Sequence, residues 1–400
     1  MPSSLWLQGQ SPAFRLMIAT SWLAPDSWQK NQEEAIHEAI WATLDWTEYL
    51  RLIDRHRTPA LSWAALKRVL GIEIPPSAEQ ELRRRSDACR MQAMRHCIHL
   101  ASVLKAFNRA GIPVMPLKGL LLSFELYADV GLRQSYDLDL AVAQDDIRRA
   151  QVCLQDLGWR LDSSYGPMTP RQWERLWRTE QHLEFTQPQG DCALELHWRN
   201  VWDTPDMENA RWARSTPVAW QGCTYQAMNP IDQALYLCSH GGRHAWVRAK
   251  WLGDMARIHA DGRIDWQAAL DQARSVEQEK PQLVCLQLLS LVYGLPLPAL
   301  PGNPWRNQSS FLITTPLKAL ASRLDPAELG TLDEFRSVLS LACYERLILP
   351  QKIWRKNLAR FIHSHRDFAV LALPDRLFWA YAPLRPFLWV WRRLSRLWSR

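Results

Sequence analysis

The 400-residue chain lacks the patterns of several common protein classes. Its most apolar long segment, 283–300, is interrupted by Gly294, Pro296 and Pro298, so no run of 18 apolar residues exists to predict a membrane-spanning helix. The first 20 residues have no basic segment followed by an apolar run, which argues against a secretory signal peptide. These absences favour a globular protein that is not embedded in a membrane.

Several catalytic and redox motifs are also missing. None of the eight cysteines forms a Cys-x-x-Cys pair, so we expect free, buried thiols in a reducing compartment. The chain has no Walker A, Gly-x-Gly-x-x-Gly, Gly-x-Ser-x-Gly or His-Glu-x-x-His sequence. A function has to be sought in less familiar arrangements of residues.

Positive charge is confined to one end of the chain. The 48 Lys and Arg residues exceed the 41 Asp and Glu residues by seven. The last 50 residues hold 11 basic and 2 acidic residues, a net charge of +9, which leaves 37 against 39, or −2, for residues 1–350. A nearly neutral main fold does not favour nucleic acid as a partner. An apolar fraction of 47% is enough for a globular core.

The apolar spacing predicts an α+β chain. Residues 32–110 read as helices, broken at Pro75-Pro76, with Ser77 as the expected cap of a long helix that ends at Gly111. The expected strands are 113–117, 137–142, 182–186 and 192–198, and the expected helices among them are 120–127 and 144–157. Strand signals outside 112–200 are weak. We therefore expect a small mixed sheet in a core at 111–200, between helical regions at 1–110 and 201–350, with a basic aromatic tail at 351–400.

Two carboxylates stand two positions apart on the strand predicted at 137–142. Alternation along a strand places Asp137 and Asp139 on the same face. Glu195 lies on a later strand, and antiparallel or mixed pairing could bring it beside them. Three carboxylates on adjacent strands can hold two metal ions for phosphoryl or nucleotidyl transfer. When the Asp-x-Asp pair is considered alone, the alternative to a metal site is a pair of carboxylates at a strand end that is exposed to water.

A strand, the pair Lys118-Gly119 and a helix precede this acidic strand. Glycine lets the backbone approach an anion, and the start of a helix offers free N–H groups and a positive dipole end. Lys118 adds a full positive charge. This arrangement suits a phosphate, although a simple turn with a solvated lysine is the alternative.

The ordered motifs resemble the uncharacterised bacterial nucleotidyltransferase family of the DNA polymerase β-like nucleotidyltransferase superfamily. The similarity covers roughly residues 40–300. It rests on Val-Met-Pro-Leu-Lys-Gly at 114–119, Leu-Tyr at 126–127, Gly-Leu-Arg at 131–133, Asp-Leu-Asp-Leu at 137–140, Glu-Leu-His-Trp-Arg at 195–199, the His/Trp/Asp segment at 239–254 and Ile-Asp-Trp at 264–266.

The resemblance implies the roles of the main site residues. Asp137, Asp139 and Glu195 would be catalytic and would hold two Mg²⁺ ions, with Mn²⁺ as an alternative. A nucleoside triphosphate such as ATP would donate its nucleoside monophosphate to an acceptor hydroxyl and release pyrophosphate. Lys118 and Gly119 would cradle the phosphates. The resemblance also implies that Arg133 neutralises the negative charge that develops during the reaction.

Three departures from the superfamily pattern leave an alternative open. The turn is Lys-Gly rather than Gly-Ser or Gly-Gly, Gly119 and Asp137 are 18 positions apart, and the third carboxylate is a glutamate. The alternative is a degenerate, non-catalytic nucleotide-binding or scaffold protein with the same fold. The acceptor is open as well, and a small molecule, a sugar, a peptide or a protein would each satisfy the pattern.

Five further residues are candidates for an acceptor site or a cleft. His240 and His244 have a zinc-compatible i, i+4 spacing, but a third ligand is missing from the sequence around them. His197 shares a strand face with Glu195 and could orient a metal ligand or contact the acceptor. Arg248 and Asp254 could line the cleft or pair with each other.

The basic tail allows three interpretations. Phe387, Trp391, Leu394 and Trp398 fall on one helical face, and Arg392, Arg396 and Arg400 on another. Such a helix is typical of a membrane surface. Because Pro374, Pro383 and Pro386 interrupt the segment, we favour a helix that packs its aromatic face on the protein with its arginines in water. A basic site for an acidic acceptor is the third interpretation. We expect a cytoplasmic location, with peripheral contact at the inner membrane face as the alternative.

Overall fold

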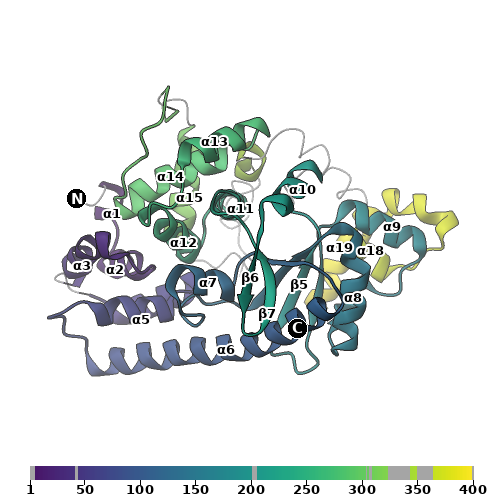
Figure 1. The fold of residues 1–400 in the computed structure, drawn as a ribbon, viewed down its shortest axis with the longest axis horizontal. Coiled ribbons are helices and arrows are strands. Elements are labelled where there is room, and N and C mark those ends of the chain that lie inside the picture. Colours follow the sequence, from purple (N-terminus) through teal and green to yellow (C-terminus); the bar gives the residue numbers. More distant parts are fainter. Residues whose placement is uncertain are drawn as a thin grey trace.

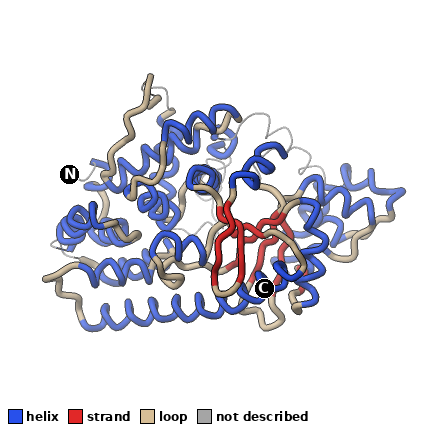
Figure 2. Tube along the Cα trace, in the orientation of Figure 1, coloured by secondary structure: helices blue, strands red, loops and turns tan. Residues whose placement is uncertain are grey.

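Helices surround one small central sheet in the computed structural model (Figures 1 and 2). The structure describes residues 5–40, 44–200, 205–302, 304–305, 309–322, 343–348 and 364–398. Within these residues no helix is both long enough and apolar enough to cross a membrane. The expected fold class, a small mixed sheet flanked by helical N- and C-terminal regions, is confirmed.

Six helices precede the sheet in the described part of the chain. They are α1 (Leu5–Gln8), α2 (Pro12–Thr20), α3 (Asp26–Ile40), α4 (Trp46–His56), α5 (Pro59–Arg68) and α6 (Pro76–Arg109). The prediction that Ser77 caps the long helix is wrong. The cap is Pro75, whose side chain makes no capping bond, and Pro76 takes the first helical position, where its missing N–H costs nothing.

Helix α6 connects two hydrophobic cores. It runs along the lower edge of the molecule, from below α5 to the strands (Figure 1). Leu82, near its start, belongs to a core formed with the other N-terminal helices and the helices after the sheet. Leu100, Leu104 and Phe107, near its end, belong to the core under the sheet. One rigid helix thus holds the helical part and the sheet together.

The central sheet contains β1 (Val114–Pro116), β2 (Asp137–Val142), β3 (Arg160–Leu161), β4 (His182–Thr186) and β5 (Ala193–His197), in the order β1-β2-β5-β4-β3. The β2–β5 pair is parallel and the other three pairs are antiparallel. Helices α7 (Leu120–Tyr127), α8 (Ile147–Asp156) and α9 (Pro170–Thr179) and the short turns η1 (Gln144–Asp146) and η2 (Ser163–Tyr165) connect the strands.

The sheet has one apolar and one polar face because its side chains alternate. Leu138, Leu140, Leu194 and Leu196 are buried in the core that α6 and α8 share with the sheet. Residues 137, 139, 195 and 197 therefore project from the opposite face. Apolar packing on one side fixes the register that places the polar residues together on the other.

A hairpin of β6 (Thr216–Trp220) and β7 (Cys223–Ala227) extends the sheet core beyond residue 200. We expected no clear strand in that region. Trp220, Cys223 and Tyr225 are buried in the sheet core, and β7 contacts β1 and α6. The other side of the hairpin is mostly exposed. The short strands therefore carry little of the apolar alternation that predicts a strand.

The remaining described helices follow the hairpin or precede it closely. They are α10 (Pro205–Arg214), α11 (Pro230–Arg243), α12 (Ala249–Ala260), α13 (Trp266–Ser275), α14 (Lys280–Tyr293), α15 (Ser310–Ala321), α18 (His365–Val370), the turn η3 (Asp375–Ala380) and α19 (Tyr381–Trp398). Residues 343–348 are helical as well. The eight cysteines are free, and six of them are buried as expected. Cys153 is half-buried and Cys343 is exposed.

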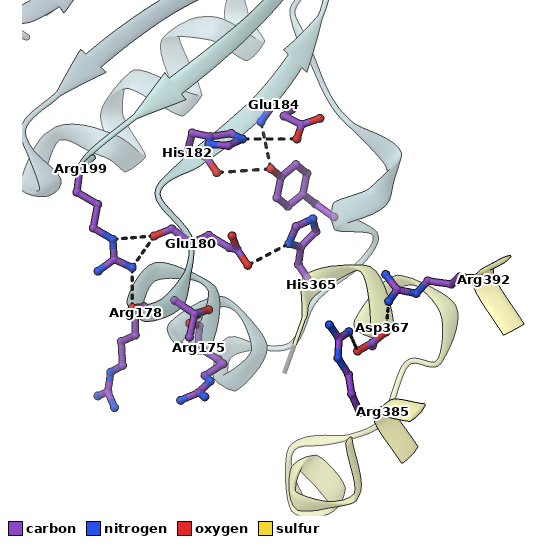
Figure 3. A network of polar contacts seen from close by, with 12 residues as sticks. Arg175, Arg178, Glu180, His182, Glu184, Arg199, His365, Asp367, Arg385 and Arg392 are labelled. Carbon is purple, nitrogen blue, oxygen red and sulfur yellow. Dashed lines mark hydrogen bonds and ion pairs between the residues drawn. The ribbon is translucent and has the colours of Figure 1, made fainter. Parts of the chain in front are cut away.

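The C-terminal helix α19 exposes aromatic side chains that we expected to be buried. Phe387 and Trp391 are 73% and 62% exposed. Arg385 and Arg392 instead turn inward and pair with the buried carboxylate of Asp367 (Figure 3). The expected packing of the aromatic face is therefore wrong for Phe387 and Trp391. Of the other predicted face residues, the side chains at 394, 396, 398 and 400 lie outside the described residues, as does the tail segment 351–363.

Candidate active site

The polar face of the sheet is organised in rows that cross three strands. Asp139 on β2 lies directly beside Glu195 on β5, which lies opposite Glu184 on β4. In the next row, His197 on β5 lies opposite His182 on β4. The parallel pairing of β2 with β5 thus places the three predicted carboxylates on one face.

Asp137, Asp139 and Glu195 form a compact acidic set. Each offers a carboxylate oxygen, and these oxygens lie within 4.8 Å of one another. Asp139 is only 1% exposed, whereas Asp137 and Glu195 are half-buried. The set therefore has a closed end at Asp139 and an open side, as a site that exchanges ligands with solvent requires.

Lys118 is the cation that faces this set. Its Nζ lies 3.0 Å from Oδ1 of Asp139. Burial alone would lower the pKa of Lys118, but the nearby negative charges, that of Asp139 above all, raise it above its ordinary value. Even so, neither carboxylate oxygen of Asp139 accepts a well-oriented hydrogen bond within the described residues. A buried carboxylate that accepts no well-oriented hydrogen bond and lies beside two others fits a hard divalent cation such as Mg²⁺.

His197 connects Glu195 to Asp139. Its Nε2 lies 3.1 Å from Oε2 of Glu195 and 3.5 Å from Oδ1 of Asp139. Burial would lower the pKa of His197, but the two carboxylates raise it. Burial would raise the pKa of Glu195, whereas the hydrogen bond and charge of His197 help to lower it to about 2. Glu195 is therefore a carboxylate at neutral pH, and His197 holds its orientation.

Gly119 joins β1 to α7 in a backbone conformation that other residues avoid, with φ of 82° and ψ of −133°. A Cβ at this position would lie 3.4 Å from Oγ of Ser135. Ser135 in turn donates to the backbone oxygen of Asp137, at 3.0 Å. The turn is thus packed against the residue that opens the acidic strand.

Two buried side chains, Arg133 and Lys250, connect the loop at 128–136 with helix α12. Nε of Arg133 lies 3.0 and 2.8 Å from the two carboxylate oxygens of Asp254, and both side chains are almost fully buried. Nζ of Lys250 donates to the backbone oxygen of Gln134 at 3.0 Å. These bonds hold the loop that leads to Asp137 in place. They also mean that the guanidinium of Arg133 already has a carboxylate partner within the protein.

One comparison with known proteins identifies the family. A family model described as "Uncharacterised nucleotidyltransferase" matches residues 42–294. The chain belongs to this nucleotidyltransferase family. No curated protein and no solved structure matches the chain. The match contains α4–α14, and thus every residue of the acidic set and both partners of the Arg133–Asp254 pair. As a member of this family, the chain is a transferase.

The other predicted residues of this nucleotidyltransferase occupy different surroundings. His240 and His244 lie with ring centroids 5.0 Å apart, and both rings pack against Trp251. Arg248 donates to the backbone oxygen of Arg55, whereas the carboxylate of Asp254 pairs with Arg133. Whether His197, His240, His244, Arg248 or Asp254 takes part in acceptor binding stays a prediction.

Two residues near the carboxylates escaped the sequence analysis. His182 reaches the polar face only because β4 pairs with β5 in a specific register. Tyr236 lines a cavity of about 330 Å³ with Arg211, Arg214, Ser239 and Gln272, and the charges of Lys118, Asp139 and Glu195 act on its buried hydroxyl. The sequence did not mark Tyr236 as a candidate, because a tyrosine on a helix is usually a core residue.

The deeply buried His56 predicts that the protein loses stability in acid. Burial, and then the charges of Arg55 and Arg248, lower the pKa of His56 well below 6.5. Below about pH 6.5 the unfolded chain binds a proton that the folded chain excludes at His56, so the free energy of unfolding falls as the pH falls. His56 contributes a slope of about 1.4 kcal/mol per pH unit.

His56 offers a clean test of this slope. The backbone N–H of Ala249 donates to its Nδ1 at 3.0 Å, a bond that the side-chain oxygen of an asparagine can accept. Between about pH 5 and 6.5, we expect His56→Asn to lower the slope of the free energy of unfolding against pH. The decrease should correspond to about one fewer proton taken up on unfolding. Urea denaturation at several pH values measures it. Parallel curves for wild type and variant would contradict the assignment of a neutral, buried His56.

Proposed function

We propose that the protein transfers a nucleoside monophosphate from a nucleoside triphosphate to an acceptor hydroxyl and releases pyrophosphate, with two Mg²⁺ ions bound by Asp137, Asp139 and Glu195. Mn²⁺ is the alternative ion. The observation that carries the proposal is the acidic set, in which oxygens from neighbouring strands lie within 4.8 Å. Such carboxylate sets serve in-line displacement at phosphorus. The DNA polymerase β-like nucleotidyltransferase superfamily is the proposed wider grouping.

The acidic set holds the cations, and the chain's other residues arrange the substrates. Mg²⁺ at such a site makes an acceptor hydroxyl more acidic and neutralises the phosphates. In the reaction, the acceptor oxygen forms a bond to the α-phosphorus, the bond to the β-phosphate oxygen breaks, and the hydroxyl proton is released to water. Asp139, the most buried carboxylate, fixes the centre of the site.

Lys118 and the turn at Gly119 are the proposed phosphate contacts. The ammonium of Lys118 lies beside Asp139 and gains a second anionic partner when a triphosphate enters. The left-handed backbone at Gly119 opens α7, whose first N–H groups favour an anion. Arg133 faces Asp254 instead, so we propose that it positions the loop before Asp137.

The cavity beside Tyr236 is the proposed place for the nucleoside or the acceptor. Its lining includes the amides of Gln272 and Gln278 and the guanidinium of Arg211, groups that hydrogen-bond to a small polar molecule. A small-molecule or sugar acceptor fits this cavity. The base preference and the acceptor would be found by supplying each labelled nucleoside triphosphate with Mg²⁺ and sets of hydroxyl-bearing candidates.

The alternative is a protein that binds a nucleotide without transferring it. The Lys-Gly turn and the third carboxylate, a glutamate, motivate this alternative. The two functions differ in one measurement. Label transfer, or release of pyrophosphate, above the level of a chain lacking the acidic set supports the transferase. Saturable nucleotide binding with no pyrophosphate from any nucleoside triphosphate and acceptor would support the alternative.

The exposed aromatic face of α19 supports peripheral contact with an anionic membrane as an additional property. Trp379 is 67% exposed and lies, like Phe387 and Trp391, in the chain segment that carries a net charge of +9. Exposed aromatic side chains beside basic residues favour the interface of an anionic bilayer. The cytoplasmic location stays a prediction.

Vesicle binding tests this surface. We expect the protein to sediment with phosphatidylglycerol vesicles more than with phosphatidylcholine vesicles. Phe387→Ser with Trp391→Ser should weaken the binding at least about tenfold, because each ring contributes about 1.5–3 kcal/mol when buried. Leu70→Ser with Ile98→Ser is the matched control, since both side chains are exposed apolar groups away from α19, Leu70 in the turn after α5 and Ile98 on α6. Equal loss in the two double variants would contradict the proposal.

A further inference from the structure

The structure assigns a second cation site, formed by His182, Glu195 and His197, that takes a transition-metal dication of the Zn²⁺ class rather than Mg²⁺. Each residue offers one ligand atom, and these atoms lie within 4.8 Å of one another. The site shares Glu195 with the acidic set but lies one strand further along the sheet, toward β4. It does not depend on whether the protein transfers nucleotides.

The register of two antiparallel strands builds this site. His182 on β4 and His197 on β5 are direct cross-strand neighbours, and their ring centroids are 5.0 Å apart. Glu195 lies two positions before His197, so it points to the same face. Its Oε2 already lies 3.1 Å from Nε2 of His197. No change of strand pairing is needed to bring the three donors together.

The donor set selects the class of ion. Two imidazole nitrogens and one carboxylate oxygen form a ligand set that suits Zn²⁺ and leaves a fourth position for water. Mg²⁺ prefers oxygen ligands alone, which the acidic set provides. Two neighbouring sets that differ in donor chemistry therefore distinguish two ions, with Glu195 common to both.

The polar atoms of His182 support a ligand role. Its Nδ1 is buried and has no hydrogen-bond partner within the described residues. Its Nε2 lies 3.5 Å from Oε1 of Glu184, longer than a hydrogen bond (Figure 3). A purely structural histidine would be expected to satisfy at least one ring nitrogen fully. The side chains of His182 and Glu195 are 19% and 31% exposed, so an ion can enter from solvent.

Two spectroscopic probes separate the sites without using any nucleotide. Co²⁺ bound by nitrogen and oxygen ligands in place of Zn²⁺ gives visible d–d absorption, and Mn²⁺ bound to the acidic set is counted by electron paramagnetic resonance. We expect His182→Asn to weaken Co²⁺ binding beyond the about 10–100-fold that losing a second-shell partner causes. Asp137→Asn should weaken Mn²⁺ binding only, and Glu195→Gln should weaken both.

The other histidine pair provides the matched control. His240 and His244 also have ring centroids 5.0 Å apart, but neither belongs to a metal-compatible group in the described chain. We expect His244→Asn to leave the Co²⁺ spectrum unchanged. Circular dichroism and thermal unfolding of each variant show whether it is folded. If His182→Asn misfolds, competition of Zn²⁺ against Co²⁺ on wild type, with Mn²⁺ binding followed in parallel, replaces it.

The outcomes decide the proposal in either direction. Loss of Co²⁺ binding in folded His182→Asn but not in His244→Asn supports it, as does Zn²⁺ displacing Co²⁺ while Mn²⁺ stays bound. Absence of Co²⁺ binding to wild type, binding that survives His182→Asn, or binding that is lost in Asp137→Asn instead would each overturn it. A failure here leaves the transferase proposal intact, because none of these measurements involves substrate.

Discussion

Asp139→Asn is expected to reduce nucleotidyl transfer by at least about 1,000-fold, equivalent to about 4 kcal/mol of transition-state stabilisation. The substitution keeps the size of the side chain and removes its charge. Asp139 is the most buried of the three carboxylates and the one that Lys118 faces at 3.0 Å. In the variant, only the carboxylates of Asp137 and Glu195 would attract cations. Lys118 would lose its anionic partner.

The strand next to the acidic set provides a control for this prediction. Glu184 lies directly opposite Glu195, in the same row of the sheet face as Asp139, but outside the acidic set. We expect Glu184→Gln to retain transfer to within about threefold, since a change this far from the reacting atoms costs well under 1 kcal/mol. Pyrophosphate release with Mg²⁺ measures both variants. Equal activity of wild type and folded Asp139→Asn would sink the proposed mechanism.

Local structure around the site was predictable because the signals there are short-range. Alternating residues gave strand bounds at 137–142 and 182–186 that the structure reproduces, and the helix at 120–127 follows from its apolar run after Gly119. The pairing partners of these strands were less constrained by the sequence. Parallel pairing of β2 with β5 joins two segments that are far apart in the chain, with α8, α9 and β4 between them.

The same limit explains which site residues the sequence analysis missed. Asp137, Asp139 and Glu195 stand in recognisable motifs, and the structure brings them together. His182 becomes a candidate only once β4 lies beside β5, because nothing local distinguishes it from a surface histidine. The local sequence pattern also could not predict which face of α19 is buried. Arg385 and Arg392 turn inward because they pair with Asp367, a buried carboxylate outside the helix.

The buried pair of Arg133 and Asp254 predicts the largest effect on stability. We expect Asp254→Ala to lower the free energy of unfolding by about 3–5 kcal/mol, because it leaves the guanidinium of Arg133 charged and buried without its counter-ion. Burial and the charge of Arg133 lower the pKa of the neighbouring Lys250 well below its ordinary value, so Arg133 is the cation that Asp254 balances. Urea denaturation monitored by tryptophan fluorescence measures the change.

A double variant separates charge from packing in this pair. Arg133→Met with Asp254→Leu replaces both charges with apolar groups, and we expect it to recover most of the stability that Asp254→Ala loses. Glu174→Ala is the matched control for an exposed pair, since Glu174 and Arg178 are 59% and 72% exposed and such pairs contribute about 0–1 kcal/mol. If the double variant were as unstable as Asp254→Ala, lost packing rather than an unpaired charge would explain the effect. Recovered stability without recovered transfer would instead show that the pair positions the loop before Asp137, which is the role proposed for Arg133.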